Sequence, residues 1–93
     1  MVLKLITIDL LIPCCSSLKE KRYVLNGLKT KLRRRFNVSV SEVDFQDKWQ
    51  RCKLAVATVG ADRSIVDSGC DKALKLIEND GRVQVLDYCE EIR

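Results

Sequence analysis

A long amphipathic segment, Ser17 to Phe36, places the strongest constraint on how this chain can fold. At about 100° per residue, one side of a helix over this segment is apolar apart from a single lysine, Lys21. The apolar side chains are Leu18, Val24, Leu25, Leu28, Leu32 and Phe36. Ser17 and Glu20 form an S-x-x-E capping box that starts the helix. Such a helix must lie on a second apolar layer, and we expect the Lys21 ammonium to reach water past the end of that core.

The remaining segments predict four strands and a second helix. Apolar residues that alternate with polar ones between turn-forming residues are typical of half-buried strands. The predicted strands are Val2–Pro13, Val38–Phe45, Arg51–Gly60 and Arg82–Ile92. The second helix is predicted to start at a cap on Asp62 or Ser64 and to end near Asn79, with Gly81 as its C-terminal cap. In the second strand the alternation changes phase, which predicts a β-bulge near Ser41–Glu42.

The order strand–helix–strand–strand–helix–strand predicts a ferredoxin-like α+β fold. Residues 1–93 then form one domain, with a four-stranded antiparallel sheet and both helices on one face. The other face of the sheet is left bare. The apolar side chains predicted to lie on it are Leu3, Leu5, Leu11, Ala55, Ala57 and Val59. An exposed apolar surface of this kind predicts homo-oligomerisation, through the open sheet face or through a sheet edge.

The composition argues against most catalytic and metal sites. The chain has no histidine, which excludes Ser-His and Cys-His pairs. Its four glycines form no phosphate-binding loop, and its five cysteines form no C-x-x-C pair. We therefore expect no enzymatic activity, no metal and no cofactor. The adjacent Cys14 and Cys15 leave a redox-active pair as an alternative to a plain loop, and the other cysteines are expected to be packing residues or half-exposed thiols.

Three residues keep an enzymatic alternative open. Glu42 and Asp44 are two residues apart on a predicted strand, so both carboxylates should point to the same face. Such a pair can bind a cation or serve in acid–base chemistry, with Lys21 as a third group. The other interpretation is ordinary surface charge in exposed ion pairs.

The positive charge is concentrated in one segment. The chain carries a net charge of +4, but residues 17–53 hold eleven basic and four acidic residues, +7, and the remainder holds six and nine, −3. On the first helix, a polar line spans about 80° of the wheel and consists of Lys19, Arg22, Asn26, Lys29 and Arg33. Arg34 and Arg35 extend it. Cations spaced along a helix can follow a run of phosphates, and guanidinium groups suit phosphate oxygens. The alternative is a solvated face that only keeps the protein soluble.

Two aromatic residues are candidates for stacking on unpaired bases. Tyr23 lies on the exposed side of the first helix, and Trp49 lies in the hairpin between the second and third strands. The aromatic residues that RNA-recognition motifs carry on their sheet are absent here, so we expect the helix face to contact RNA. A loop tryptophan can instead pack against its own domain.

Several motifs together resemble the YlxP-like family of small bacterial proteins of unknown function. They are S-L-K-E-K-R at 17–22, R-F-N-V-S-V at 35–40, E-V-D-x-Q-D-x-W-Q-R at 42–51, I-P at the end of the first strand and A-D-R-S at 61–64. The resemblance implies a ferredoxin-like fold. It also implies ribosomal RNA or the ribosome as a partner, because genes of this family often lie beside those for translation initiation and ribosome-maturation factors. The Cys14–Cys15 loop departs from the glycine-containing loop expected in the family.

The sequence therefore predicts a non-enzymatic RNA- or ribosome-associated protein. The residues predicted to contact phosphate are Lys19, Arg22, Lys29, Arg33, Arg34 and Arg35. The alternative is a homo-oligomeric protein-interaction module with no nucleic-acid role. The longest apolar run is too short to span a membrane and no signal peptide is evident, which predicts a cytoplasmic protein without membrane contact.

Overall fold

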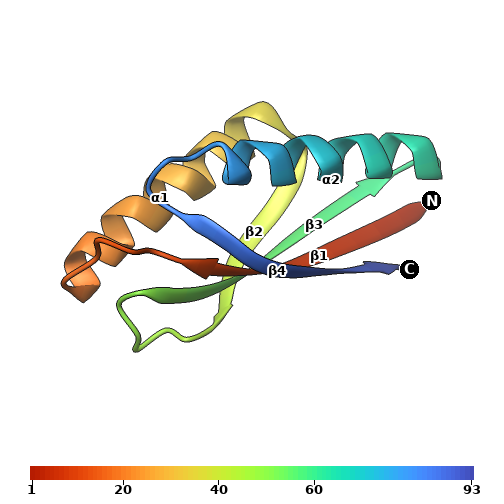
Figure 1. The fold of residues 1–93 in the computed structure, drawn as a ribbon. Helices are drawn as coiled ribbons and strands as arrows, with labels where there is room; N and C mark the ends of the chain where they lie inside the picture. The colour runs from red at the N-terminus through yellow and green to blue at the C-terminus, as the bar shows by residue number, and fades with distance from the viewer.

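The structure is a computed structural model that describes all residues from 1 to 93. The strands are β1 (Val2–Leu11), β2 (Val38–Asp44), β3 (Arg51–Gly60) and β4 (Gln84–Ile92), and the helices are α1 (Leu18–Arg35) and α2 (Arg63–Glu78). The strands form one antiparallel sheet in the order β2-β3-β1-β4. Both helices cover the same face of this sheet (Figure 1). The predicted ferredoxin-like α+β fold is confirmed.

The helix starts follow the predicted caps, with one difference in detail. The Ser17 hydroxyl accepts a hydrogen bond from the Glu20 N–H at 3.1 Å, but the Glu20 carboxylate reaches back to Ser16 instead of Ser17, at 2.8 Å from its N–H. Asp62 caps α2 by accepting from the Ile65 N–H at 3.1 Å. The predicted cap at Gly81 is wrong, because no glycine in the chain takes a positive φ.

The core lies between the sheet and the two helices. From β1 and β3 it takes the side chains at alternate positions, and from α1 it takes Leu25, Leu28 and Leu32. A buried ammonium ties α2 to the edge strand β4. Lys4 lies 2.8 Å from Asp67 of α2 and 3.2 Å from Glu90 of β4. This bridge supports β4, most of whose side chains are exposed.

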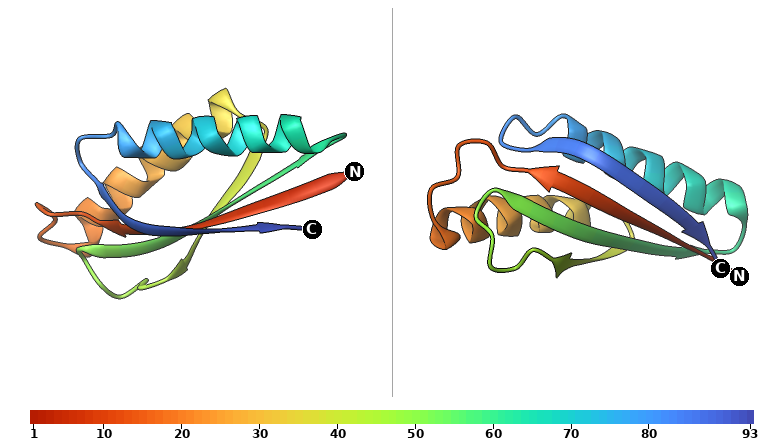
Figure 2. Two further views of the ribbon diagram at one scale, coloured as in Figure 1. Left: turned by 45° about the vertical axis from the view of Figure 1, so that its right-hand side comes forward. Right: turned by 60° about the horizontal axis from the view of Figure 1, so that its bottom comes forward.

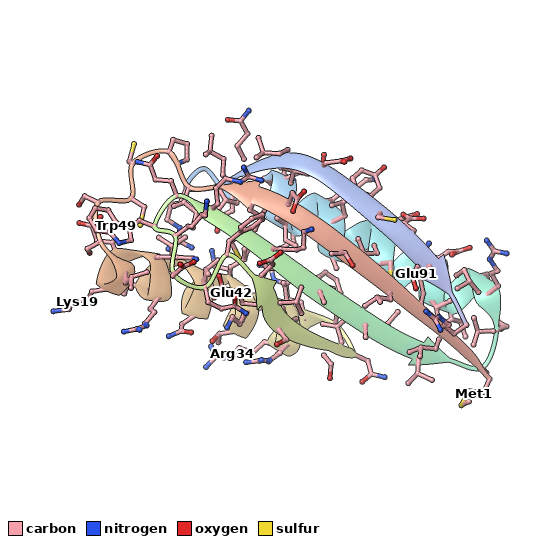
Figure 3. All side chains as sticks on the ribbon, turned by 90° about the horizontal axis from the view of Figure 1, so that it is seen from below. Met1, Lys19, Arg34, Glu42, Trp49 and Glu91 are labelled. Atoms are coloured by element: carbon pink, nitrogen blue, oxygen red, sulfur yellow. The ribbon has the colours of Figure 1, made fainter.

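The opposite face of the sheet carries the apolar residues that the alternation predicts. Leu3 pairs with Val59 and Leu5 with Ala57 across β1 and β3, so their side chains form one patch. Leu3 and Val59 are 39% and 47% exposed. No helix covers this face, as the view from below shows (Figure 3). The two termini meet at one end of the sheet (Figure 2), where Leu3 and Arg93 exchange both backbone hydrogen bonds. Neither helix combines the length and the apolar character that crossing a bilayer requires.

Candidate nucleic-acid interface

Lys21 is the most deeply buried charged residue of the chain, with 2% of its surface exposed. Its Nζ lies 2.6 Å from the Phe45 carbonyl oxygen and 2.8 Å from the Glu42 carboxylate. Phe45 takes a left-handed backbone with φ 63°, and its N–H donates to the Asp44 carboxylate at 2.7 Å. The prediction that Lys21 reaches water is therefore wrong. The end of β2 closes over the first turns of α1 and supplies the ammonium with a carboxylate and a carbonyl.

The bulge in β2 decides which carboxylate is available to Lys21. The pairing with β3 shifts between Glu42 and Asp44, which confirms a bulge close to the predicted place. Glu42 pairs with Leu54 on the helix side of the sheet, whereas Asp44 pairs with Lys53 on the open side. The prediction that both carboxylates share a face is wrong, because the extra residue reverses the alternation. Nowhere do three or more cysteine or acidic side chains converge as metal ligands would.

The other cations of α1 are not neutralised by the protein itself. Of the eight Lys or Arg residues on this helix, only Lys21 has a carboxylate within 4.0 Å. The remaining seven are Lys19, Arg22, Lys29, Lys31, Arg33, Arg34 and Arg35. The single acid of α1, Glu20, is held by hydrogen bonds from Ser16, which lower the pKa of its carboxyl. The outer surface of α1 therefore carries a large excess of positive charge.

The predicted polar line lies along the side of α1 that borders β2. The Arg33 guanidinium donates to the Val40 carbonyl of β2 at 2.9 Å, which leaves its other N–H groups in a fixed orientation. Lys19 and Arg22 are exposed, and Lys29 is half-buried. Burial raises the pKa of the Cys52 thiol to about 12. The nearby charges of Lys21 and Lys29 act in the opposite direction but have a smaller effect.

The three consecutive arginines at the end of α1 point in different directions. Arg33 reaches β2, while Arg35 lines a groove beside Leu76 and Asn79 at the end of α2. Since successive helix residues differ by about 100°, Arg34 lies between them on the outer side. Figure 3 shows Lys19 and Arg34 at the margin formed by α1 and β2, with Glu91 on β4 at the other end of the molecule. Arg34 thus extends the predicted line, whereas Arg35 leaves it.

Tyr23 borders a groove at the start of the cationic row. The tyrosine is 76% exposed, and the groove encloses about 550 Å³ between the β1–α1 loop, the first turns of α1 and the α2–β4 turn. Ile12 and Val24 are among its apolar lining residues, and Lys19 and Arg82 supply cations. Volumes of this size are typical of sites that hold small ligands. The sequence pointed to Tyr23 but not to the groove, because Arg82 is distant along the chain.

Trp49 lies in the β2–β3 loop, half-exposed, at the same end of the molecule as Lys19 (Figure 3). The Gln50 side-chain amide donates to the Cys15 carbonyl at 3.2 Å and so ties this loop to the β1–α1 loop. The ring of Phe45 is covered by three cations, of which the Arg51 guanidinium is the closest, at 4.8 Å. Both predicted stacking residues are accessible, Tyr23 on the first turns of α1 and Trp49 on the β2–β3 loop.

Comparison with known proteins places the chain in a family. Residues 3–89 match the family described as "Protein of unknown function (DUF503)". The chain belongs to the DUF503 family. Over 63 residues, which are 68% of each chain, it is 40% identical to a Bacillus subtilis (strain 168) protein described as "Uncharacterized protein YlxP". The resemblance to the YlxP-like family is confirmed, and the DUF503 match includes the whole of α1.

Proposed function

We propose that this DUF503 protein is a non-enzymatic RNA-binding protein of the bacterial cytoplasm, with ribosomal RNA or the ribosome as its partner. The observation that carries the proposal is the row of α1 cations without intramolecular carboxylates. A cation that is already paired with a carboxylate gains little binding free energy from a phosphate. The unpaired cations of α1, in contrast, can each replace a counterion of the nucleic acid.

The contact would run along the outer margin of α1. Lys19, Arg22, Lys29 and Arg33 would follow the phosphates on the β2 side, with Arg34 at the far end. The Val40 carbonyl restrains Arg33, so this guanidinium loses less side-chain freedom when it binds phosphate. At the near end, Tyr23 and Trp49 offer exposed rings on which unpaired bases can stack.

The test measures affinity for ribosomal RNA fragments across a salt series. Replacing Arg33, Arg34 and Arg35 by alanine should weaken binding at least about tenfold at low salt. The slope of log K against log salt should become shallower by about 1.4, since Arg33 and Arg34 lie on the contact and each lost phosphate contact contributes about 0.7 for a single strand. Circular dichroism would check that the variant is folded.

A second triple variant controls for net charge. Arg63, Lys75 and Arg93 lie outside α1, and replacing all three by alanine removes the same charge. The proposal expects this variant to bind nearly as well as the wild type. Absence of binding at low salt, or an equal loss in both variants, would contradict a specific role for α1. Co-sedimentation with ribosomal subunits from a cell extract then tests the partner.

The bare sheet face supports a second candidate, a homo-oligomeric interaction module. Its apolar patch includes Leu3, Leu5 and Val59 on neighbouring strands. Light scattering would give the mass in solution, and a Leu3→Lys variant should shift an oligomer towards monomer. An oligomer that binds no RNA would select this candidate.

A further inference from the structure

A second groove lies between the end of α1 and the first half of α2, with the ends of β2 and β3 beneath it. It encloses about 470 Å³. α1 contributes Arg35 to its lining, and α2 contributes Lys72 and Ser68. None of its lining residues is acidic, and neither cation has a carboxylate within 4.0 Å. This groove is distinct from the β2 side of α1, where Arg33 and the polar line lie.

The distribution of charge around α2 favours an anion in this groove. At about 100° per residue, Ser68 and Lys72 share the side of α2 that meets α1, whereas Asp67 and Asp71 lie on the other side. The ion pairs of Lys4 confirm that orientation. Lys4 pairs with both Asp67 of α2 and Glu90 of β4, so Asp67 lies on the side of α2 that faces β4. Asp62 caps α2 and accepts hydrogen bonds from the Ile65 N–H and from the Ser64 hydroxyl. The Ser64 hydroxyl is therefore already used within the chain.

Free hydrogen-bond donors accompany the two cations. The Ser68 hydroxyl and the side-chain amide of Asn37 both belong to groove residues and make no hydrogen bond within the chain. Thr58 differs, because its hydroxyl donates to the Asn37 backbone carbonyl at 2.9 Å. Beside these polar groups, the Ile65 side chain is about half exposed, at 55%. The groove thus combines cationic donors with an apolar border.

We propose that this groove binds the terminal phosphate of a nucleotide, with the phosphate between Arg35 and Lys72 and the sugar or base against Ile65. A phosphate monoester carries about −1.5 to −2 charges at neutral pH, against −1 for an internal phosphodiester, so it suits two cations without a counter-charge. The source is either the 5′ end of an RNA or a free nucleoside monophosphate. The first case rests on the RNA-binding function proposed above.

The experiment compares one single-stranded RNA with a 5′-phosphate and with a 5′-hydroxyl, together with a nucleoside 5′-monophosphate. Lys72→Glu is the informative variant, because Arg35 also belongs to the arginine run of α1. Lys75→Glu is its matched control. Lys75 is an unpaired lysine of the same helix that does not line the groove. Both variants change the net charge equally.

We expect the 5′-phosphate to raise affinity about five- to tenfold in the wild type and in Lys75→Glu, and to have no effect in Lys72→Glu. If only the monophosphate binds, and Lys72→Glu alone abolishes that binding, the site stands with a free nucleotide as its source. If wild type binds both RNAs equally and no monophosphate, the groove proposal is overturned while RNA binding through α1 survives. If neither RNA binds, monophosphate binding that Lys72→Glu abolishes supports the groove site. Absence of monophosphate binding overturns it.

Discussion

The buried ammonium of Lys21 allows the sharpest test of the structure. Replacing it by methionine keeps much of the side-chain volume and removes the charge. The Glu42 carboxylate then loses its only cation, and the Phe45 carbonyl loses its side-chain donor at 2.6 Å. Because the carboxylate is largely enclosed by α1 and β3, water can replace the ammonium only in part.

The expected loss follows from the burial of the two partners. Removing one member of a buried ion pair typically costs about 3–5 kcal/mol, since the other charge remains uncompensated. Glu42 keeps 18% of its side chain exposed, which places the expected loss near the lower end, at about 3 kcal/mol. For a domain of this size each kcal/mol shifts Tm by about 4–8 °C, so Tm should fall by at least about 12 °C.

Urea denaturation followed by far-UV circular dichroism would measure the free energy of unfolding. Lys19→Met is the matched control: the same replacement at an exposed position of α1 should change stability by less than about 0.5 kcal/mol. Adding Glu42→Leu to Lys21→Met should recover part of the loss, because no unpaired charge then remains. A loss below about 1 kcal/mol for Lys21→Met, or a double variant less stable than the single one, would refute the reasoning.

Three further predictions concern stability and reactivity. Gly27→Ala should raise the free energy of unfolding by about 0.5–1 kcal/mol, because the new Cβ would lie an ordinary 3.6 Å from the Arg82 guanidinium; a loss in urea denaturation would show that Arg82 needs the space. Acidification from pH 7 to pH 3 should destabilise the wild type more than Asp67→Asn. The hydrogen bond from Lys4 lowers the pKa of Asp67 below its ordinary value of about 3.9. The ionised carboxylate therefore stabilises the fold fully above about pH 3.9, and this stabilisation is lost as the pH falls through the lowered pKa. Equal pH profiles of stability for the two proteins would contradict this. A thiol reagent should spare buried Cys52 until the protein is denatured, which intact mass would show. The thiols expected to react in the native protein are Cys14 and Cys89.

Local patterns were sufficient for the architecture because each element carries its own signal. The apolar spacing of Leu25, Leu28 and Leu32 marks the buried side of α1 whatever it packs against. The phase change after Val40 likewise revealed a bulge in β2. The side of α1 on which Lys19, Arg22 and Arg33 lie follows from the same periodicity, so the cationic row was predictable as well.

Contacts between distant segments were not predictable in this way. Periodicity shows which side of a helix is apolar, but not which neighbouring element covers its borders. Lys21 depends on the end of β2, where Glu42 lies on the helix side, a single extra residue turns Asp44 to the open side, and the left-handed Phe45 presents its carbonyl. The groove beside Tyr23 needs Arg82, and the groove beside Arg35 needs Lys72.

The sequence by itself determined the order of the elements and a basic outer surface on α1, because spacing and charge are properties of the local chain. Only the tertiary structure decided which of those charges are free. It neutralised Lys21 within the fold, held Arg33 against β2 and turned Arg35 towards α2. The reason is physical: an ion pair depends on distances of a few ångströms between elements, and those distances exist only after the helices have packed on the sheet.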